Sequence, residues 1–567
     1  MTLKRNFLLQ LIMIVLTVVP FISVSQNLSW QWARGAGGGE DDVARAVVAD
    51  DMGNLYVAGY FSSPLISFDT VNLSNAGSGS SDVFIAKYDA YGNVLWAKRA
   101  GGSGDDYALS ACLTDSWGIY VAGTFKSSSI TFDSYTLTNS NPPNEALFVV
   151  KYDVAGSIVW AKTAANSPDN DAANSVTVDP LGNIFITGYF QSTAITFGAN
   201  TLYNAAYPGQ DIFVVKFDPD ANVLWARSAG GTHNDIGNAV TVDATGDVLI
   251  GGEFMSEYFT IGAFTLNNFG CSKADAFVAK YDGQGNVIWV TAAGGSDHDR
   301  VLSVSTDNTG NFYAAGYFKS SSIVLGPTTL VNEGPPYGDF FLVKFNTEGS
   351  VFWAVKSVGS QSSDGINSVV YDNGGGLYVT GHFQSQHIVF GPDVLSNASS
   401  PGMETFIARF DASTGNAMWG LAIPGPGNDA GNAVLPAMPG CVYIGGQFTS
   451  TSLTFGSTML TNAAASKNDL FIARLDGNVG IPAFTGGETL FIYPNPFCSE
   501  ALLSIGKDLN DAEVTLVNCC GQFVRHITHS AGDAFVLSRA GLANGLYFVK
   551  LVTGGRVIAA RKVIVTD

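Results

Sequence analysis

The chain has 567 residues, a formal net charge of −20 at neutral pH, and 46% hydrophobic against 13% charged residues. So negative a surface repels phosphate groups and anionic lipid heads, which argues against nucleic acid and peripheral membrane as partners. The six cysteines show neither repeat spacing nor zinc-ligand spacing, and a chain of this size does not require a disulfide framework.

The first 25 residues have the pattern of a cleaved secretory leader. Lys4 and Arg5 precede an apolar run, and Ser23 and Ser25 supply the small side chains that a signal peptidase reads. We therefore expect cleavage between Ser25 and Gln26, and no transmembrane segment in the mature chain. An uncleaved membrane anchor is the alternative, but the apolar run is marginal in length for crossing a bilayer.

Residues 26–480 consist of seven repeats of about 64 residues. Each repeat contains four short extended segments separated by Gly, Asn and Asp, as at 174–179, 183–190, 211–218 and 222–229. Four such strands form one blade, so the sequence predicts an all-β protein with a seven-bladed β-propeller and almost no helix. One tryptophan recurs in each repeat, and we expect these rings to pack between blades instead of stacking on carbohydrate. They are Trp32, Trp96, Trp160, Trp225, Trp289, Trp353 and Trp419.

The order of the segments predicts how the ring closes. The chain starts with a fourth segment at 30–34, and the seventh repeat ends with a third segment at 469–476. The N-terminal strand should therefore complete the last blade, which leaves no sheet edge open at the join.

A piece inserted between the second and third segments, as at 195–204, predicts an extra hairpin. The Asp-x-x-Gly-Asn pattern, as at 89–93, predicts a tight turn.

The repeats end near residue 478, and a smaller module follows. Residues 481–488 have the composition of a linker, and residues 489–567 show alternating apolar residues with Gly and Asn punctuation. This pattern predicts a small immunoglobulin-like β-sandwich.

Two resemblances to known families rest on these motifs. The pattern Asp-x-x-Gly-Asn followed by alternating apolar residues and Gly, at 50–61 and 307–318, resembles the bacterial SBBP-type β-propeller repeat. That resemblance implies the fold but says little about activity. Residues 489–567 resemble the C-terminal (Por) sorting domain of the type IX secretion system of Bacteroidetes. The resemblance implies export across the outer membrane by that machinery, followed by release or attachment to the cell surface. The matching signature residues are Tyr493, Pro494, Asn495, Pro496, Gly521, Gly541, Gly545 and Tyr547.

An aspartate precedes the first strand of every repeat: Asp42, Asp106, Asp171, Asp235, Asp299, Asp364 and Asp429. If the first strands line the channel, these carboxylates form a ring near one mouth that could hold a hard cation such as Ca²⁺. The alternative is that each carboxylate accepts backbone N–H groups in its own loop. A basic residue on each third strand could also pair with them. These residues are Lys87, Lys151, Lys216, Lys280, Lys344, Arg409 and Arg474.

The sequence favours binding over catalysis. It contains no GxSxG, HExxH or phosphate-binding glycine motif, and no cofactor is identified from it. We therefore expect a secreted or surface-attached module that adheres to extracellular glycan or protein. The alternative is a polysaccharide hydrolase or lyase at the channel mouth, with His298 and Asp299 in the site. A purely structural surface protein is a third possibility.

Overall fold

The computed structural model describes residues 28–477 and 491–566, apart from 51, 115–117, 166, 271–272, 360, 398–400, 439, 465, 505–511, 519–522, 530–533, 543–544 and 554–555. The predicted leader with Ser25 and Gln26, the linker at 481–488, and Gly521 lie outside the described residues. The elements found within those residues are strands, which agrees with the predicted near-absence of helix. Accordingly, the described part of the chain has no helix of the length and hydropathy that crossing a membrane takes.

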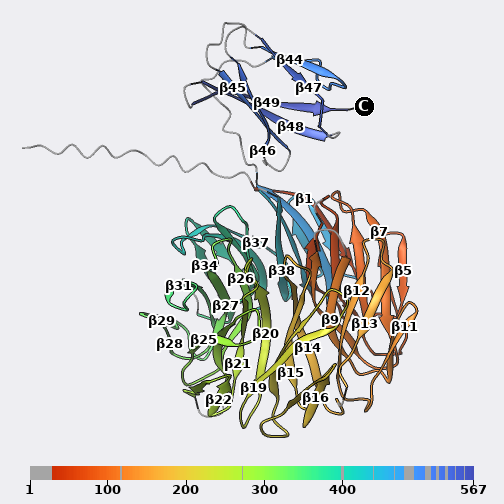
Figure 1. Cartoon of the computed structure of the whole chain (residues 1–567), viewed down its shortest axis with the longest axis vertical. Coiled ribbons are helices and arrows are strands. Elements are labelled where there is room, and N and C mark those ends of the chain that lie inside the picture. Colours follow the sequence, from red (N-terminus) through yellow and green to blue (C-terminus); the bar gives the residue numbers. More distant parts are fainter. Residues whose placement is uncertain are drawn as a thin grey trace, which may run out of the picture.

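Seven four-stranded antiparallel sheets form the blades, and Figure 1 shows them following one another in sequence colours. The inner strands are β2 (Asp42–Ala49), β8 (Asp106–Thr114), β14 (Asp171–Val178), β20 (Asp235–Val242), β26 (Asp299–Thr306), β32 (Asp364–Tyr371) and β38 (Asp429–Met438). Each pairs with a second strand: β3 (Leu55–Phe61), β9 (Gly118–Phe125), β15 (Ile184–Phe190), β21 (Val248–Phe254), β27 (Phe312–Phe318), β33 (Gly376–Phe383) and β39 (Cys441–Phe448).

The second strand of each blade pairs with a third, and the third pairs with an outer strand. The third strands are β6 (Asp82–Tyr88), β12 (Ala146–Tyr152), β18 (Asp211–Phe217), β24 (Asp275–Tyr281), β30 (Asp339–Phe345), β36 (Glu404–Asp411) and β42 (Asp469–Gly477). The outer strands are β7 (Val94–Gly101), β13 (Ile158–Lys162), β19 (Val223–Gly230), β25 (Val287–Ala293), β31 (Val351–Lys356), β37 (Ala417–Ile423) and β1 (Leu28–Ala36). The predicted seven-bladed propeller is confirmed.

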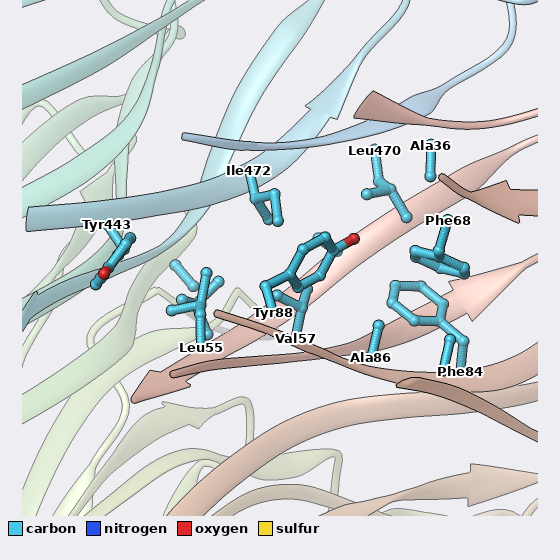
Figure 2. Packing of buried hydrophobic residues seen from close by; sticks show 14 of the residues in the cluster. Ala36, Leu55, Val57, Phe68, Phe84, Ala86, Tyr88, Tyr443, Leu470 and Ile472 are labelled. Atoms are coloured by element: carbon cyan, nitrogen blue, oxygen red, sulfur yellow. The ribbon is translucent and has the colours of Figure 1, made fainter. Parts of the chain in front are cut away.

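The N-terminal strand closes the ring, as the sequence predicts. β1 is antiparallel to β42, with Trp32 opposite Arg474 and Ala36 opposite Leu470, and in Figure 1 it lies beside the blue strands of the last blade. Figure 2 shows the core at this join, where Leu470 and Ile472 of the last blade face Val57 and other buried residues of the first. The join therefore buries apolar side chains as the other blade junctions do.

The inserted pieces form seven two-stranded hairpins, which confirms that prediction. At two junctions a hairpin extends the sheet of the preceding blade, since Thr131 pairs with Gly101 and Ile261 pairs with Ala229. The hairpins are β4 (Leu65–Phe68) with β5 (Val71–Ser74), β10 (Ser129–Phe132) with β11 (Tyr135–Thr138), β16 (Ala194–Phe197) with β17 (Asn200–Tyr203), β22 (Tyr258–Ile261) with β23 (Phe264–Asn267), β28 (Ser322–Leu325) with β29 (Thr328–Val331), β34 (His387–Phe390) with β35 (Asp393–Ser396), and β40 (Ser452–Phe455) with β41 (Thr458–Thr461).

The recurring tryptophans pack between blades, as expected. Trp225 donates its indole N–H to the Gly283 carbonyl of the next blade at 3.1 Å. Its ring lies against Gly285, where a Cβ atom would be only 2.8 Å from Cδ2. The equivalent contacts join Trp32 to Gly92, Trp289 to Gly349 and Trp353 to Gly415. Glycine at this turn therefore serves two purposes: it adopts a positive φ and it makes room for the indole of the preceding blade.

The C-terminal module has two small antiparallel sheets. One contains β43 (Phe491–Tyr493), β44 (Glu500–Ser504) and β47 (Ala534–Ser538), and the other contains β45 (Ala512–Asn518), β46 (Phe523–His529), β48 (Gly545–Thr553) and β49 (Arg556–Val565). Leu503, Leu537, Val514 and Val549 are among the buried residues of a single core cluster drawn from both sheets. The core is thus built as in a sandwich.

Candidate functional site

The inner strands of all seven blades enclose a central channel with a volume of about 690 Å³. At the end where these strands finish, a second cavity of about 970 Å³ continues from it and shares the lining residues Leu113, Thr241, Ser305 and Val370. The first segment of each repeat therefore lines the channel, as propeller geometry leads one to expect. A central channel is the usual place for a ligand in a fold of this kind.

One β-bulge interrupts each inner strand at the same position. In β2, for example, the register with β3 shifts between Ala44 and Ala46, so Arg45 is the extra residue. A bulge turns its side chain away from the normal alternation of a strand. The seven bulge residues all line the channel, and they are Arg45, Leu109, Asn174, Asn238, Leu302, Asn367 and Asn432.

Four of these bulge residues tie adjacent blades together. Asn174 donates through Nδ2 to the Gly237 carbonyl at 3.0 Å, and Asn238 donates to the Val301 carbonyl at 2.9 Å. Asn367 and Asn432 repeat the contact, and the acceptor of Asn432 is Ala44 of the first blade, at 2.9 Å. One step along four of the strands, a serine hydroxyl accepts a backbone N–H group of the next blade, as Ser303 does from Val369 at 3.0 Å. Hydrogen bonds between blades therefore hold the channel wall.

The predicted aspartate ring lies beneath the loops at the other end of the inner strands. All seven side chains are at most 2% exposed, and each carboxylate accepts a hydrogen bond from a serine hydroxyl after the second strand of its own blade. The Oγ–Oδ2 distance is 2.6–2.8 Å in six blades, and Ser450 and Asp429 make the same contact in the seventh. The same serines also donate their backbone N–H groups to Oδ1, as Ser320 does to Asp299 at 3.1 Å.

Burial disfavours the charged form of these carboxyls. It raises the pKa of Asp42, Asp106, Asp235 and Asp299 to about 7, and of Asp429 to about 6. The neighbouring blade adds a second buried carboxyl beside several of them, as Asp275 does for Asp299. These contacts favour the loop-holding role over the calcium ring, which stays a prediction. Across the described ranges, no three His, Cys, Asp or Glu side chains gather closely enough to hold a metal ion.

The basic residues of the third strands do not pair with these aspartates. They lie at the opposite end of the blade, where five of them approach the aspartate of the turn that follows the inner strand. Lys344 approaches Asp307 at 3.6 Å and Arg409 binds Asp372 at 2.6 Å. The turn itself is of the predicted kind, because Asp307 Oδ1 accepts the backbone N–H groups of Thr309 and Asn311. The proposed pairing is wrong because each basic residue lies near the end of the third strand, and in these antiparallel sheets that end is level with the end of the inner strand, not with its start.

The two residues of the enzymatic alternative make separate structural contacts. His298 Nδ1 accepts the backbone N–H of Ala274 at 3.1 Å, whereas Asp299 is buried against Ser320. Neither side chain lines the channel or the cavity at its far mouth. The structure therefore does not bring them together around a space for a substrate.

A further cavity, of about 330 Å³, opens at the mouth where the inner strands begin. Arg45, Tyr60, Ser62, Ser81 and Tyr107 contribute to its lining. The Arg45 guanidinium lies 5.7 Å from the centre of the Tyr60 ring, and that ring meets Tyr107 edge to face at 4.7 Å. Sequence reasoning missed this cluster. The available signal was that Arg45 is the one basic residue in a column otherwise made of Asn and Leu.

The described sorting-signature residues hold the start of the C-terminal module to its last strand. Asn495 accepts the backbone N–H of Ile564 through Oδ1 at 2.8 Å, between Pro494 and Pro496. Tyr493 is exposed, whereas Tyr547 is buried and pairs with Val563. Gly541 adopts a φ of +77°, which explains glycine at that turn. Gly545 begins β48, and Gly521 lies outside the described residues.

Family models match both the propeller and the C-terminal module of the chain. Residues 491–566 match the secretion system C-terminal sorting domain, and residues 159–189 match the beta-propeller repeat family SBBP. An uncharacterised WD repeat-containing protein of Acanthamoeba polyphaga mimivirus is 23% identical over 65% of this chain and 37% of its own length. The regulatory protein FlaEY of Caulobacter vibrioides is 23% identical over 50% of this chain and 30% of its own. The chain thus spans about a third of the length of these relatives.

Two solved structures of low similarity align with most of this chain. The Pan2 WD40 domain of Neurospora crassa aligns with 79% of this chain and 96% of its own at 10% identity, with a TM-score of 0.39. The quinohemoprotein alcohol dehydrogenase of Comamonas testosteroni aligns with 82% of this chain and 78% of its own at 14% identity, with a TM-score of 0.37.

The sorting domain marks this chain for secretion across the outer membrane to the surface or the medium. The chain is a β-propeller protein with SBBP-type repeats and a C-terminal sorting domain of the type IX secretion system.

Proposed function

We propose that the propeller is an extracellular binding module that adheres to glycan or protein, with its ligand site at the channel mouth where the inner strands begin. The observation that carries the proposal is the column of bulge residues. The repeats keep the buried aspartate, its serine and the tryptophan in all seven blades, whereas the bulge position varies among Arg, Leu and Asn. Variation at a position that lines the channel suits ligand selection.

The rigidity of the wall supports the same proposal. Asparagine and serine side chains join neighbouring blades around much of the channel. A ligand that enters such a site meets groups that are already in place, so little conformational entropy is lost on binding. Delivery by the sorting domain also supports it, because glycans and proteins of the surroundings are the partners available to a secreted module.

Polysaccharide cleavage is the less favoured activity. The contacts of His298 and Asp299 with Ala274 and Ser320 occupy the groups that a general base and its partner would need. The binding proposal needs no such groups. It needs an open cavity with polar and aromatic lining, which the mouth beside Arg45 supplies.

A screen of the secreted chain tests the proposal. The purified protein is applied to a glycan array and to a pull-down of extracellular proteins, beside a double variant, Arg45→Leu with Tyr107→Ala. Tyr258→Ala, on an exposed hairpin, is the matched control. We expect a saturable ligand that the control retains and the double variant loses. No ligand in either screen would count against a binding function, and loss in the control alone would move the site to the hairpins.

A further inference from the structure

The bulge column contains one residue whose chemistry the fold does not use. Four members are asparagines that donate to the next blade, and two are leucines. Arg45 follows neither pattern. Its side chain is exposed, and among the described residues no carboxylate forms an ion pair with it. By contrast, Arg300, near the start of β26, is paired with Glu253. A guanidinium left without an anion in a chain of net charge −20 is available to a ligand.

The Arg45 guanidinium lies beside a pair of aromatic rings. The Tyr60 ring lies 5.7 Å from the guanidinium carbon, and the Tyr107 ring braces Tyr60 from the side. Ser62 and Ser81 hydroxyls, 2.8 Å apart, line the same cavity. The cavity thus combines one planar cation with hydroxyl groups and two aromatic rings.

One acidic group, Asp41, also lines this cavity. Asp41 Oδ1 accepts the backbone N–H of Asn468 at 2.8 Å and its side-chain amide at 2.9 Å. This carboxylate is therefore used to join the last blade to the first. Its remaining oxygen can accept a hydrogen bond from a ligand hydroxyl. A ligand carboxylate has no proton to donate to that oxygen.

We propose that this cavity binds the carboxylate of an acidic saccharide residue, with Arg45 as the carboxylate ligand. The inference rests on the binding function proposed above and names its ligand class. Arginine presents two parallel N–H donors that match the two oxygens of a carboxylate. Tyrosine rings offer faces to the C–H groups of a sugar, and the serine hydroxyls and Asp41 match its hydroxyls. A saccharide therefore uses every group of the cavity, whereas an acidic peptide side chain uses Arg45 alone.

The net charge of the chain affects which sugars it can prefer. A chain of charge −20 repels anions at long range, so a preference for an acidic sugar over its neutral counterpart has to arise from direct contact. Removing Arg45 should then remove the preference itself and not only weaken binding.

Calorimetry on the full secreted chain tests the assignment, with uronate oligosaccharides, their neutral counterparts and an acidic peptide as probes. Arg45→Leu places in β2 the residue that blades two and five already carry, so the fold accepts it. Leu302→Asn, at the same bulge on β26, is the matched control. Supporting results are tighter binding of the uronate than of the neutral sugar, a loss of about tenfold or more in Arg45→Leu, and no change in Leu302→Asn.

The other outcomes overturn the inference in distinguishable ways. Equal affinity for acidic and neutral sugars, unchanged in Arg45→Leu, would refute the role of Arg45 but leave the binding function standing. Binding of the acidic peptide without binding of either sugar would refute the saccharide and retain a protein ligand. Absence of binding to these probes, together with an empty glycan and protein screen, would overturn both proposals.

Discussion

Ser320 donates its hydroxyl to Asp299 at 2.7 Å and its backbone N–H to the same carboxyl group at 3.1 Å, in a site without solvent exposure. The same pair recurs in every blade, so each blade has a buried carboxyl that holds the loop leading into its inner strand. The cost of charging such a group in a buried site makes the propeller sensitive to pH.

Thermal stability should fall as pH rises from 5 to 8. The pKa of Asp299 is raised to about 7 by burial, well above the value of about 4 in an unfolded chain. The folded state therefore binds the proton more tightly, and this stabilisation is complete below the unfolded pKa and lost as pH rises through 7. Asp307 acts in the opposite sense below pH 4, because hydrogen bonds lower its pKa to about 2.

Asp299→Asn isolates this effect, because an amide stays neutral throughout the range. We expect a smaller difference in Tm between pH 5 and pH 8 than in the wild type, measured by calorimetry. Asp89→Asn, at a nearly exposed turn whose carboxyl has a lowered pKa, is the control and should not reduce that difference. An unchanged slope in Asp299→Asn would mean that this carboxyl is not protonated in the folded chain.

The contact of Trp225 with Gly285 predicts a large cost for Gly285→Ala. Alanine at φ +81° costs about 1–2 kcal/mol in backbone strain. Its Cβ would also lie 2.8 Å from the indole, and such overpacking costs about 1–3 kcal/mol more. Gly246 has a similar φ of +87°, and an added Cβ would meet no atom within 4 Å. Gly246→Ala should therefore be destabilised by the backbone strain alone. Equal destabilisation of the two variants in denaturant titrations would show that the indole contact is unimportant.

Ring closure by β1 predicts that removal of residues 26–36 exposes the edge of β42. We expect a lower Tm and concentration-dependent self-association, because an open strand edge pairs with other chains. Size-exclusion chromatography with light scattering measures the latter. Gln31→Ala, an exposed side chain on β1, controls for changes in this strand. A truncated chain that stays monomeric with the Tm of the intact protein would contradict the closure.

Secretion should depend on Asn495, which accepts the N–H of Ile564 in the last strand. Replacement by alanine removes a hydrogen bond worth about 0.5–1.5 kcal/mol and loosens the start of the sorting domain from its end. We expect a smaller fraction of the chain at the cell surface and in the medium, with the rest retained in the periplasm. Glu500→Gln, at an exposed position, should be secreted normally. Normal secretion of Asn495→Ala would show that this contact is not needed for export.

The sequence predicts the architecture well because repetition multiplies weak signals. Seven tryptophans at nearly equal spacing reveal the blades, and a fourth segment at the start of the chain reveals its pairing with β42. The aspartate column is equally visible, but its partner serines lie about twenty residues away, after the second strand of the blade. The choice between metal ligand and loop support therefore depends on burial, which spacing does not give.

The candidate site is harder to predict because it depends on a bulge. An extra residue in a strand leaves no mark when its neighbours are small and apolar, as Ala44 and Ala46 are around Arg45. Comparison of the seven repeats shows Arg45 as the exception in its column. Only the structure shows that this column lines the channel and that Tyr60 and Tyr107 stand beside the exception.

We propose the channel mouth beside Arg45 as the ligand site of an extracellular binding module. A crystal structure of the secreted chain with the tightest ligand from the glycan and protein screens tests it most directly. We expect ligand in the cavity bounded by Arg45, Tyr60 and Tyr107, within hydrogen-bond distance of the guanidinium. A ligand seated on the outer hairpins, with this cavity filled by solvent alone, would contradict it.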